Sequence, residues 1–270
     1  MVDAKRKAVK EGVGYKMNIK ILKQTENKII FHLEKTELPL VNALRRTIME
    51  EVPVMAIDEV TFVKNNSALY DEVLSHRMGL IPIITDLSTY EIEDPAQTKS
   101  KSRVKYELKL TLEAKGPCTV YARDLISKDP KVKPVYPDTP ITILLKNQNL
   151  ELEATARLGK GKEHAKFAPG LAYYREFPIL SVSKDSKLKE ATEQSKNLVV
   201  KGTKVEIRNI ASWTEADEQI CEKNNIKIDY DKENFIFTME SWGQLDVKKL
   251  PHLALDILED KLKELSKLVK

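Results

Sequence analysis

Four side chains in two neighbouring pairs could take part in proton transfer. His76 and Arg77 offer an imidazole and a guanidinium, and Asp58 and Glu59 offer two carboxylates, which are groups that general acid–base catalysis uses. No nucleophile motif such as GxSxG accompanies them. We therefore interpret His76 and Arg77 as the cationic end of a helix that pairs with nearby carboxylates, and we predict no catalytic residue.

A loop rich in glycine and lysine, Leu158–Gly170 (LGKGKEHAKFAPG), could contact phosphate. It lacks the GxxxxGKS/T spacing that surrounds a phosphate with backbone amides, and no Ser or Thr follows Lys162 to hold magnesium. We interpret the segment as a flexible basic contact loop.

The residues that bind zinc or iron–sulfur clusters are few and widely spaced. A tetrahedral zinc site needs four ligands, usually as close pairs of Cys or His, and a cubane cluster needs about four thiolates. Here the 2 cysteines and 4 histidines stand singly, at Cys118, Cys221, His32, His76, His164 and His252. The sequence therefore predicts no metal, no cluster and no cofactor, and the cysteine usage favours a reducing cytoplasm.

The bulk composition suits a folded protein of two domains, or of one domain with an insertion. The chain has 270 residues, of which 41% are hydrophobic and 32% charged, and the net charge is only +4. Such a balance is not that of a dedicated polyanion binder. No apolar run approaches the ~18–20 residues that span a bilayer, and residues 1–16 form a basic tail that no apolar signal region follows.

The elements that position these side chains follow from hydrophobic periodicity. Segments 17–22 and 28–33 are predicted to form a strand pair, and a helix is predicted from Thr36 to about Glu51, with Arg45 and Arg46 beside its apolar stripe. Residues 52–172 are predicted as one mainly β unit. Its expected strands are 54–63, 105–113, 119–123, 141–145 and 150–157, with a helix at 67–78 that Gly79 ends.

The C-terminal third contains the most regular pattern of the chain. A short strand is predicted at 178–182, and a hairpin is predicted from strands 226–230 and 234–240. From Pro251 a helix runs to the end, with Leu255, Leu258, Leu262, Leu265 and Val269 at an average spacing of about 3.5 residues. These apolar residues form one row along the helix, and the sequence leaves two alternatives open for what this row packs against: a helix of a partner or the chain's own sheet.

Three motifs together resemble one known family. Leu38–Pro53 (LPLVNALRRTIMEEVP) with Ala56–Val60 is similar to the signature helix of the alpha-like subunits of DNA-directed RNA polymerases. His76–Pro82 (HRMGLIP) resembles a second hallmark of that family, and Leu158–Gly170 resembles a third in the form typical of the archaeal D subunit. The resemblance extends in outline from Met17 to the C-terminus.

The resemblance implies an α+β fold built around a split dimerisation domain, a sheet with two packing helices. A mainly β inserted domain at 52–172, which docks on the large polymerase subunits, would interrupt it. The dimerisation domain would comprise 17–51, 173–180 and 226–270. A small ferredoxin-like insertion would occupy 181–225. This chain keeps only Cys221 there, with Glu193, Gln194 and Ser195 where cluster cysteines are expected, so we predict a degenerate insertion without an iron–sulfur cluster.

The resemblance also implies partners and contact residues. The protein would be a non-catalytic assembly scaffold within a nucleotidyltransferase complex. It would form a heterodimer with the small subunit L, dock the second-largest and largest subunits, and assemble with the small N- and P-type subunits. DNA would be reached only through the complex, and no membrane is implied. The expected dimer-interface residues are Leu40, Leu44, Ile48, Leu258, Leu262 and Leu265. The expected large-subunit contacts are Asn42, Arg45, Arg46, His76, Arg77, Lys160, Lys162 and His164.

A different class of function stays as the alternative. Arg45 and Arg46 with the Lys160–Lys166 loop could serve a free-standing nucleic-acid-binding protein. Such a protein would bind in a strongly salt-dependent way, because its lysines and arginines would displace counterions from phosphates.

Overall fold

The computed structural model describes residues 17–92, 106–202 and 204–269, so the predicted basic tail at 1–16 lies outside the described residues. The chain forms two compact units. The first contains the described residues up to Arg45 together with Ala172–Met239, and the second contains Arg46–Leu171 together with Glu240–Lys270. The fold is mixed α+β with antiparallel strand pairs, in agreement with the expected class.

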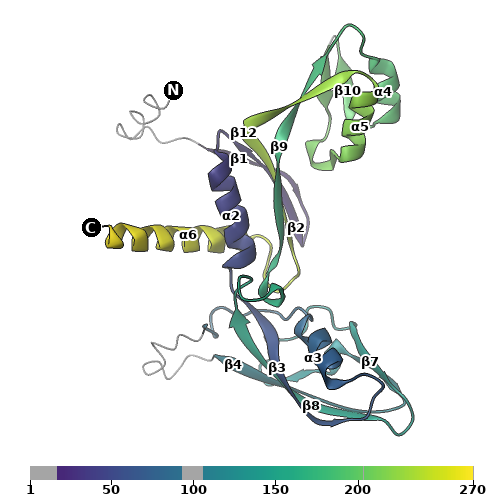
Figure 1. Ribbon diagram of the computed structural model, residues 1–270, viewed down its shortest axis with the longest axis vertical. Coiled ribbons are helices and arrows are strands. Elements are labelled where there is room, and N and C mark those ends of the chain that lie inside the picture. Colours follow the sequence, from purple (N-terminus) through teal and green to yellow (C-terminus); the bar gives the residue numbers. More distant parts are fainter. Residues whose placement is uncertain (1–16, 93–105, 203, 270) are drawn as a thin grey trace. The chain divides into compact units, whose positions relative to one another are not determined.

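The first unit is built on a four-stranded sheet. Its strands are β1 (Asn18–Gln24), β2 (Lys28–Glu34), β12 (Ile226–Ser241) and β9 (Gly170–Val182), in the order β1-β2-β12-β9 (Figure 1). The predicted pairing of the first two strands is confirmed, and the Thr25 N–H closes their turn on the Lys28 carbonyl at 2.8 Å. Phe31 stacks on Phe237 with ring centroids 5.0 Å apart, which joins β2 to β12 through the core.

The predicted hairpin at 226–240 is wrong, because β12 runs without a turn for 16 residues. Its polar middle, around Asp231, is an exposed stretch between two apolar halves. One half packs in a small cluster through Ile226, and the other packs in the main sheet through Phe235. The short strand predicted at 178–182 is likewise only the end of the longer β9.

The ends of β9 and β12 carry a small subdomain (Figure 1). Its elements are α4 (Leu188–Gln194), β10 (Leu198–Lys201), β11 (Lys204–Ile207), a 3-10 turn η3 (Ile210–Ser212) and α5 (Glu215–Lys223). They enclose a small core of Ala191, Leu198, Val205, Trp213, Cys221 and Ile226. Sequence periodicity is weak here because each element is too short to repeat its apolar positions.

Helix α2 (Leu38–Glu50) confirms the helix predicted from Thr36 to about Glu51, although it begins two residues later. Val41 and Ile48 are buried on its inner side, whereas Leu40 is exposed. The division between the two compact units falls within this helix, between Arg45 and Arg46.

The second unit contains the predicted mainly β region. Its main sheet has the order β3-β8-β4-β6, formed by β3 (Val54–Asn65), β8 (Asn149–Gly159), β4 (Glu107–Lys115) and β6 (Ile126–Ser127). A second sheet pairs β5 (Cys118–Tyr121) with β7 (Pro140–Leu144), and α3 (Asp71–Gly79) packs on β3 through Leu74 and Met78. Short 3-10 turns follow at η1 (Ala122–Asp124) and η2 (Ala165–Phe167).

Several predicted boundaries in this unit differ from the observed ones, and residue 105 of the predicted strand 105–113 lies outside the described residues. The helix predicted from residue 67 begins at Asp71, because the Ser67 side chain and backbone bond with Asn65 and Leu69 in a local turn. Gly79 is the last helical residue and has no positive φ, so it does not act as a left-handed stop. The strand predicted to reach Arg123 ends at Tyr121, where the Asp124 carboxylate accepts from the Tyr121 N–H and starts η1.

The predicted C-terminal helix is confirmed as α6 (Lys249–Leu268), with Pro251 in its first turn. Leu250 and Ala254 are buried, and every side chain from Glu259 to Val269 is exposed. Within the described part of the chain, no helix is long and apolar enough to cross a membrane.

Candidate protein-interaction surfaces

A network of charges around Asp58 joins three segments of the second unit. Asp58 on β3 accepts from Arg157 Nε of β8 at 2.6 Å and from Lys166 Nζ at 2.5 Å. Arg157 also pairs with Glu163 at 3.2 Å, and its guanidinium lies over the buried Phe167 ring at 4.9 Å. Burial would raise the pKa of Asp58, but the hydrogen bonds from Lys166 and Arg157 outweigh it and lower that pKa.

A second network ties the same loop to the end of α2. Glu51 pairs with Lys160 at 3.3 Å and with Lys261 of α6 at 2.7 Å. The Lys162 N–H donates to the Glu50 carbonyl at 3.0 Å. Gly161 is required at this crossing, because a Cβ there would lie 2.0 Å from the Met49 carbonyl oxygen.

These contacts overturn the prediction of a flexible loop. Residues 159–167 are fixed by ion pairs, a backbone hydrogen bond and the buried Phe167 ring. Asp58 and Lys166 are 108 residues apart in sequence, so local periodicity could not reveal the pairing. A fixed basic loop loses little conformational entropy on binding, which suits it to docking another protein.

The outer side of this loop shares a small cavity with α3. The cavity has a volume of about 230 Å³ and is lined by His76, His164, Leu80 and the Asp58–Lys166 pair, among others. His164 Nδ1 accepts from the Lys166 N–H at 3.1 Å, which leaves Nε2 as the hydrogen-bonding nitrogen available to a ligand. The two histidines of the predicted contact set therefore lie at one place.

The other predicted large-subunit contacts are only partly free. Arg77 and Lys162 are exposed, although Arg77 also donates to the Pro140 carbonyl at 3.1 Å. Arg46 pairs with Glu50 at 3.2 Å, and Lys160 is engaged by Glu51. In the first unit, Asn42 Oδ1 accepts from Arg45 Nε at 3.1 Å.

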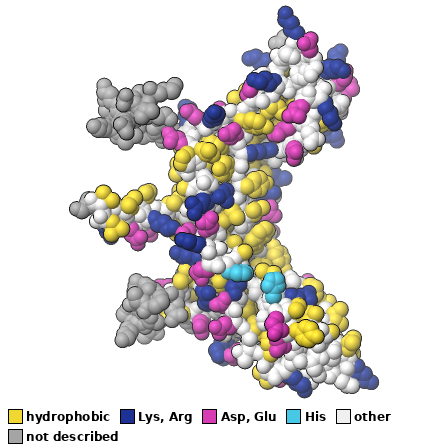
Figure 2. All heavy atoms as spheres, in the orientation of Figure 1, with side chains coloured by type: hydrophobic (Ala, Val, Ile, Leu, Met, Phe, Trp, Pro, Cys, Tyr) yellow, Lys and Arg dark blue, Asp and Glu magenta, His cyan; other side chains and the backbone are white. Residues whose placement is uncertain are grey.

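The predicted dimer-interface residues differ widely in exposure. Leu262 and Leu265 of α6 are 65% and 56% exposed, and Figure 2 shows apolar side chains on the surface of this helix. Leu40 is also exposed, while Leu44 and Leu258 are half-buried. Ile48 is completely buried, so it contributes to this chain's own core and offers no surface to a partner.

Sequence reasoning missed two exposed apolar residues on β1. Ile19 and Ile21 are 58% and 59% exposed, and they pair with Leu33 and Phe31 across the strand ladder. They therefore lie on the same sheet face as those two core residues. The alternation of Met17, Ile19 and Ile21 predicts a strand with one apolar face, but no signal in the sequence shows that part of this face stays exposed.

A metal ion in a protein is usually held by a cluster of His, Cys, Asp or Glu side chains. Within 17–92, 106–202 and 204–269, no group of three or more His, Cys, Asp or Glu side chains is placed to hold a metal ion. The charged clusters around Asp58 and Glu51 consist instead of ion pairs between carboxylates and Lys or Arg side chains.

Asp58→Asn is expected to destabilise the second unit by about 1–2 kcal/mol at neutral pH, because two charge-assisted hydrogen bonds weaken. The folded pKa of Asp58 lies below its ordinary 3.8, so the stabilisation is full above that value and is lost as pH falls through the lowered pKa. Urea unfolding of wild type and Asp58→Asn, at neutral pH and near pH 3, measures the loss of stability at each pH. Equal loss at both pH values would contradict the assignment, and Glu59→Gln, at an exposed neighbour, is the control.

Comparisons with known proteins identify similar chains. Residues 56–170 match the family described as the RNA polymerase Rpb3/RpoA insert domain. The DNA-directed RNA polymerase subunit Rpo3 of Pyrococcus horikoshii is 39% identical over 249 residues, which cover 90% of this chain and 93% of that one. The Rpo3 subunit of Pyrococcus furiosus is 37% identical over 263 residues, 93% of this chain and 98% of its own. The Rpo3 subunit of Methanosarcina mazei is 34% identical over 257 residues, which cover 92% of this chain and 97% of that one.

Proposed function

The chain belongs to the Rpo3 family, the alpha-like subunits of DNA-directed RNA polymerase that function in transcription, and from this premise we propose that it is the complex's assembly scaffold. In this proposal the subunit forms a heterodimer with a small alpha-like partner, the L-type subunit. It then docks the second-largest and largest subunits, with the small N- and P-type subunits in the same assembly. Templating and nucleotide chemistry belong to those large subunits, so this chain contacts DNA only through the complex.

The main support for the proposed heterodimer is the row of exposed apolar side chains along α6. Leu255, Leu262 and Leu265 are exposed at helical spacing, and from Glu259 to Val269 every side chain of this segment is exposed. Monomeric proteins rarely leave such a row uncovered, and a spacing of about 3.5 residues suits a partner helix. Ile19 and Ile21 on β1 add apolar surface in the first unit. Coexpression with the L-type subunit, followed by a mass measurement, tests the proposal.

The proposed division of labour follows the expected domains. Segments 17–51, 173–180 and 226–270 form the split dimerisation domain, and 52–172 is the docking domain. Support comes from the insert-domain family, whose match at 56–170 falls inside the docking segment. The compact units divide the chain differently, since they group Glu240–Lys270 with Arg46–Leu171. The proposed domains are therefore distinguished by the subunits that they are proposed to bind, and their boundaries differ from those of the two compact units.

The small subdomain at 181–225 is proposed to be the ferredoxin-like insertion in a form that works without a cluster. Its single cysteine, Cys221, is buried among apolar side chains, and burial raises the pKa of the thiol to about 11. A neutral thiol is a poor metal ligand, because metals bind the thiolate. A hydrogen-bond network around Asp217 supplies the cross-links that a cluster would otherwise make.

The free-standing nucleic-acid-binding alternative has little support. Arg46, Lys160 and Lys166, three of the cations that it would use, are paired with carboxylates of the same chain. A cytoplasmic location stays a prediction that follows from the proposed role in transcription.

Reversing two exposed charges of the docking domain tests the large-subunit contact. Arg77→Glu with Lys162→Glu is expected to weaken binding of the assembled heterodimer to the second-largest subunit by about tenfold, because rim charges contribute up to about 1 kcal/mol each. Surface plasmon resonance measures the affinity, and light scattering checks that the heterodimer is intact. Lys128→Glu with Lys146→Glu makes the same charge change at other exposed lysines of the unit. Equal weakening by both pairs would refute the assigned contact.

A further inference from the structure

A cavity in the first unit forms a slot between two strands. It has a volume of about 870 Å³ and is lined by every residue of Phe177–Val182 on β9 and by every residue from Lys204 to Ile210. Successive side chains of a strand point to opposite faces of its sheet. A cavity that contacts consecutive residues of β9 and of β11 therefore runs along the edges of both strands rather than across a sheet face.

Both edges lack a neighbouring strand in the part of the chain that is described. β9 is the last strand of the order β1-β2-β12-β9, and β11 pairs only with β10. Pro178, which has no N–H to donate, fits an outer edge because its position there costs no ladder hydrogen bond. The β11 edge, with no proline, is the one that keeps a full set of backbone donors and acceptors.

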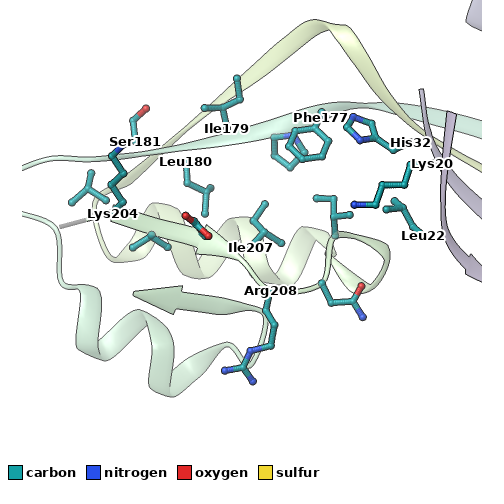
Figure 3. Close-up of a pocket in the computed structure, with 16 residues that line it drawn as sticks. Lys20, Leu22, His32, Phe177, Ile179, Leu180, Ser181, Lys204, Ile207 and Arg208 are labelled. Atoms are coloured by element: carbon teal, nitrogen blue, oxygen red, sulfur yellow. The ribbon is translucent and has the colours of Figure 1, made fainter. Parts of the chain in front are cut away.

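The slot is apolar in the middle and positively charged at its ends. Figure 3 shows Leu180 and Ile207 pointing into the space from opposite sides, while Arg208 points away from it. Lys20 and Lys204 line the slot, and no carboxylate among the described residues pairs with either. Glu206, the one acid of the lining, is held by Lys201 at 2.6 Å.

We propose that this slot binds an extended acidic segment of a protein partner, which adds as a strand to the outer edge of β11. Backbone groups of β11 would pair with the segment, as in β-strand addition. Alternate apolar side chains would contact Leu180 and Ile207, and acidic side chains would face Lys20 and Lys204. The slot shares none of the predicted dimer-interface or large-subunit contacts, so the proposal stands independently of them.

The lining favours a peptide over single-stranded nucleic acid. Sequence-tolerant binding of single strands uses exposed aromatic rings on which bases stack. The only rings of the lining, His32 and Phe177, stack on each other with centroids 4.6 Å apart. Free strand edges, by contrast, recognise a peptide backbone directly.

The test uses the full chain and a fluorescent synthetic peptide in which valine and glutamate alternate. Anisotropy is expected to show binding, and amide hydrogen exchange is expected to slow in Lys204–Ile207. Lys20→Glu with Lys204→Glu should weaken binding about tenfold, because two attractive contacts with the acidic segment become repulsive. The matched control is Lys23→Glu with Lys189→Glu, exposed lysines of β1 and α4 that do not line the slot.

Three results would overturn the proposal. The first is no binding, or no slowing of exchange in β11. The second is equal binding of a peptide whose backbone nitrogens are methylated, since it cannot donate to a strand edge. The third is tighter binding of an oligothymidylate of the same length, which would reassign the slot to nucleic acid.

Discussion

Leu262→Asp with Leu265→Asp is expected to abolish the 1:1 complex with the L-type subunit. Leu262 and Leu265 are largely exposed in this chain, so their full burial against a partner helix would contribute about 1.5–3 kcal/mol each. Losing both, and burying two carboxylates instead, should weaken the complex by more than about a hundredfold. Light-scattering masses of the mixed subunits measure the loss.

The control for this experiment lies on the opposite side of the same helix. Lys267→Asp places the same side chain in the last turn of α6 but off the row of apolar side chains, so the complex should keep its mass. Circular dichroism of the unmixed chain should be unchanged in all variants, because neither leucine is part of the chain's own core. A stable complex with both aspartates in place would exclude α6 as the interface and with it the central part of the proposed scaffold.

The elements that the sequence predicts well are those whose pattern repeats several times. Helices α2 and α6 carry three or more apolar residues at helical spacing, and β1 and β2 are two apolar segments separated by a short polar turn. The long strand β12 was misread because its polar middle has the composition of a turn. Composition cannot distinguish a turn from a strand that leaves one core and enters another.

The contacts at the candidate surfaces were harder to predict for a different reason. The charged residues in and beside the loop are visible in the sequence, but their partners are not. Arg157 of β8, for example, pairs with Asp58, which is 99 residues away in the sequence. Exposure is also a tertiary property. Leu262 and Ile48 belong to the same kind of helical stripe, yet the first is exposed and the second is fully buried. The slot beside β11 depends on which strand edges stay unpaired, and no local pattern encodes that.

Replacing Asp217 with alanine is expected to destabilise the small subdomain by about 2–4 kcal/mol, because several buried donors lose their acceptor. Asp217 is 7% exposed and accepts from Ser195 Oγ at 2.5 Å, from Asn197 Nδ2 at 3.1 Å and from the Thr214 N–H at 2.9 Å. The last bond closes a capping box at the start of α5. Urea unfolding followed by Trp213 fluorescence, in a Trp242→Phe background, measures the loss.

The pH dependence of this loss separates Asp217 from a simple packing role. Burial would raise the pKa of Asp217, but its hydrogen bonds with Ser195, Thr214 and Asn197 outweigh it and lower that pKa. The stabilisation is therefore full above the ordinary carboxyl value of 3.8 and disappears as pH falls through the lowered value, so wild type and variant should converge in acid. Glu215→Ala, in the first turn of the same helix, is the exposed control.

Chelation tests whether the folding of the small subdomain depends on a metal. If the Asp217 network replaces a cluster, a strong chelator should leave the unfolding midpoint of the subdomain unchanged, because no metal–ligand bond contributes to its folding free energy. A midpoint that falls on chelation, together with an Asp217→Ala variant as stable as wild type, would reverse the assignment. The subdomain would then depend on a metal after all, and Cys221 would have to leave its apolar core to bind it.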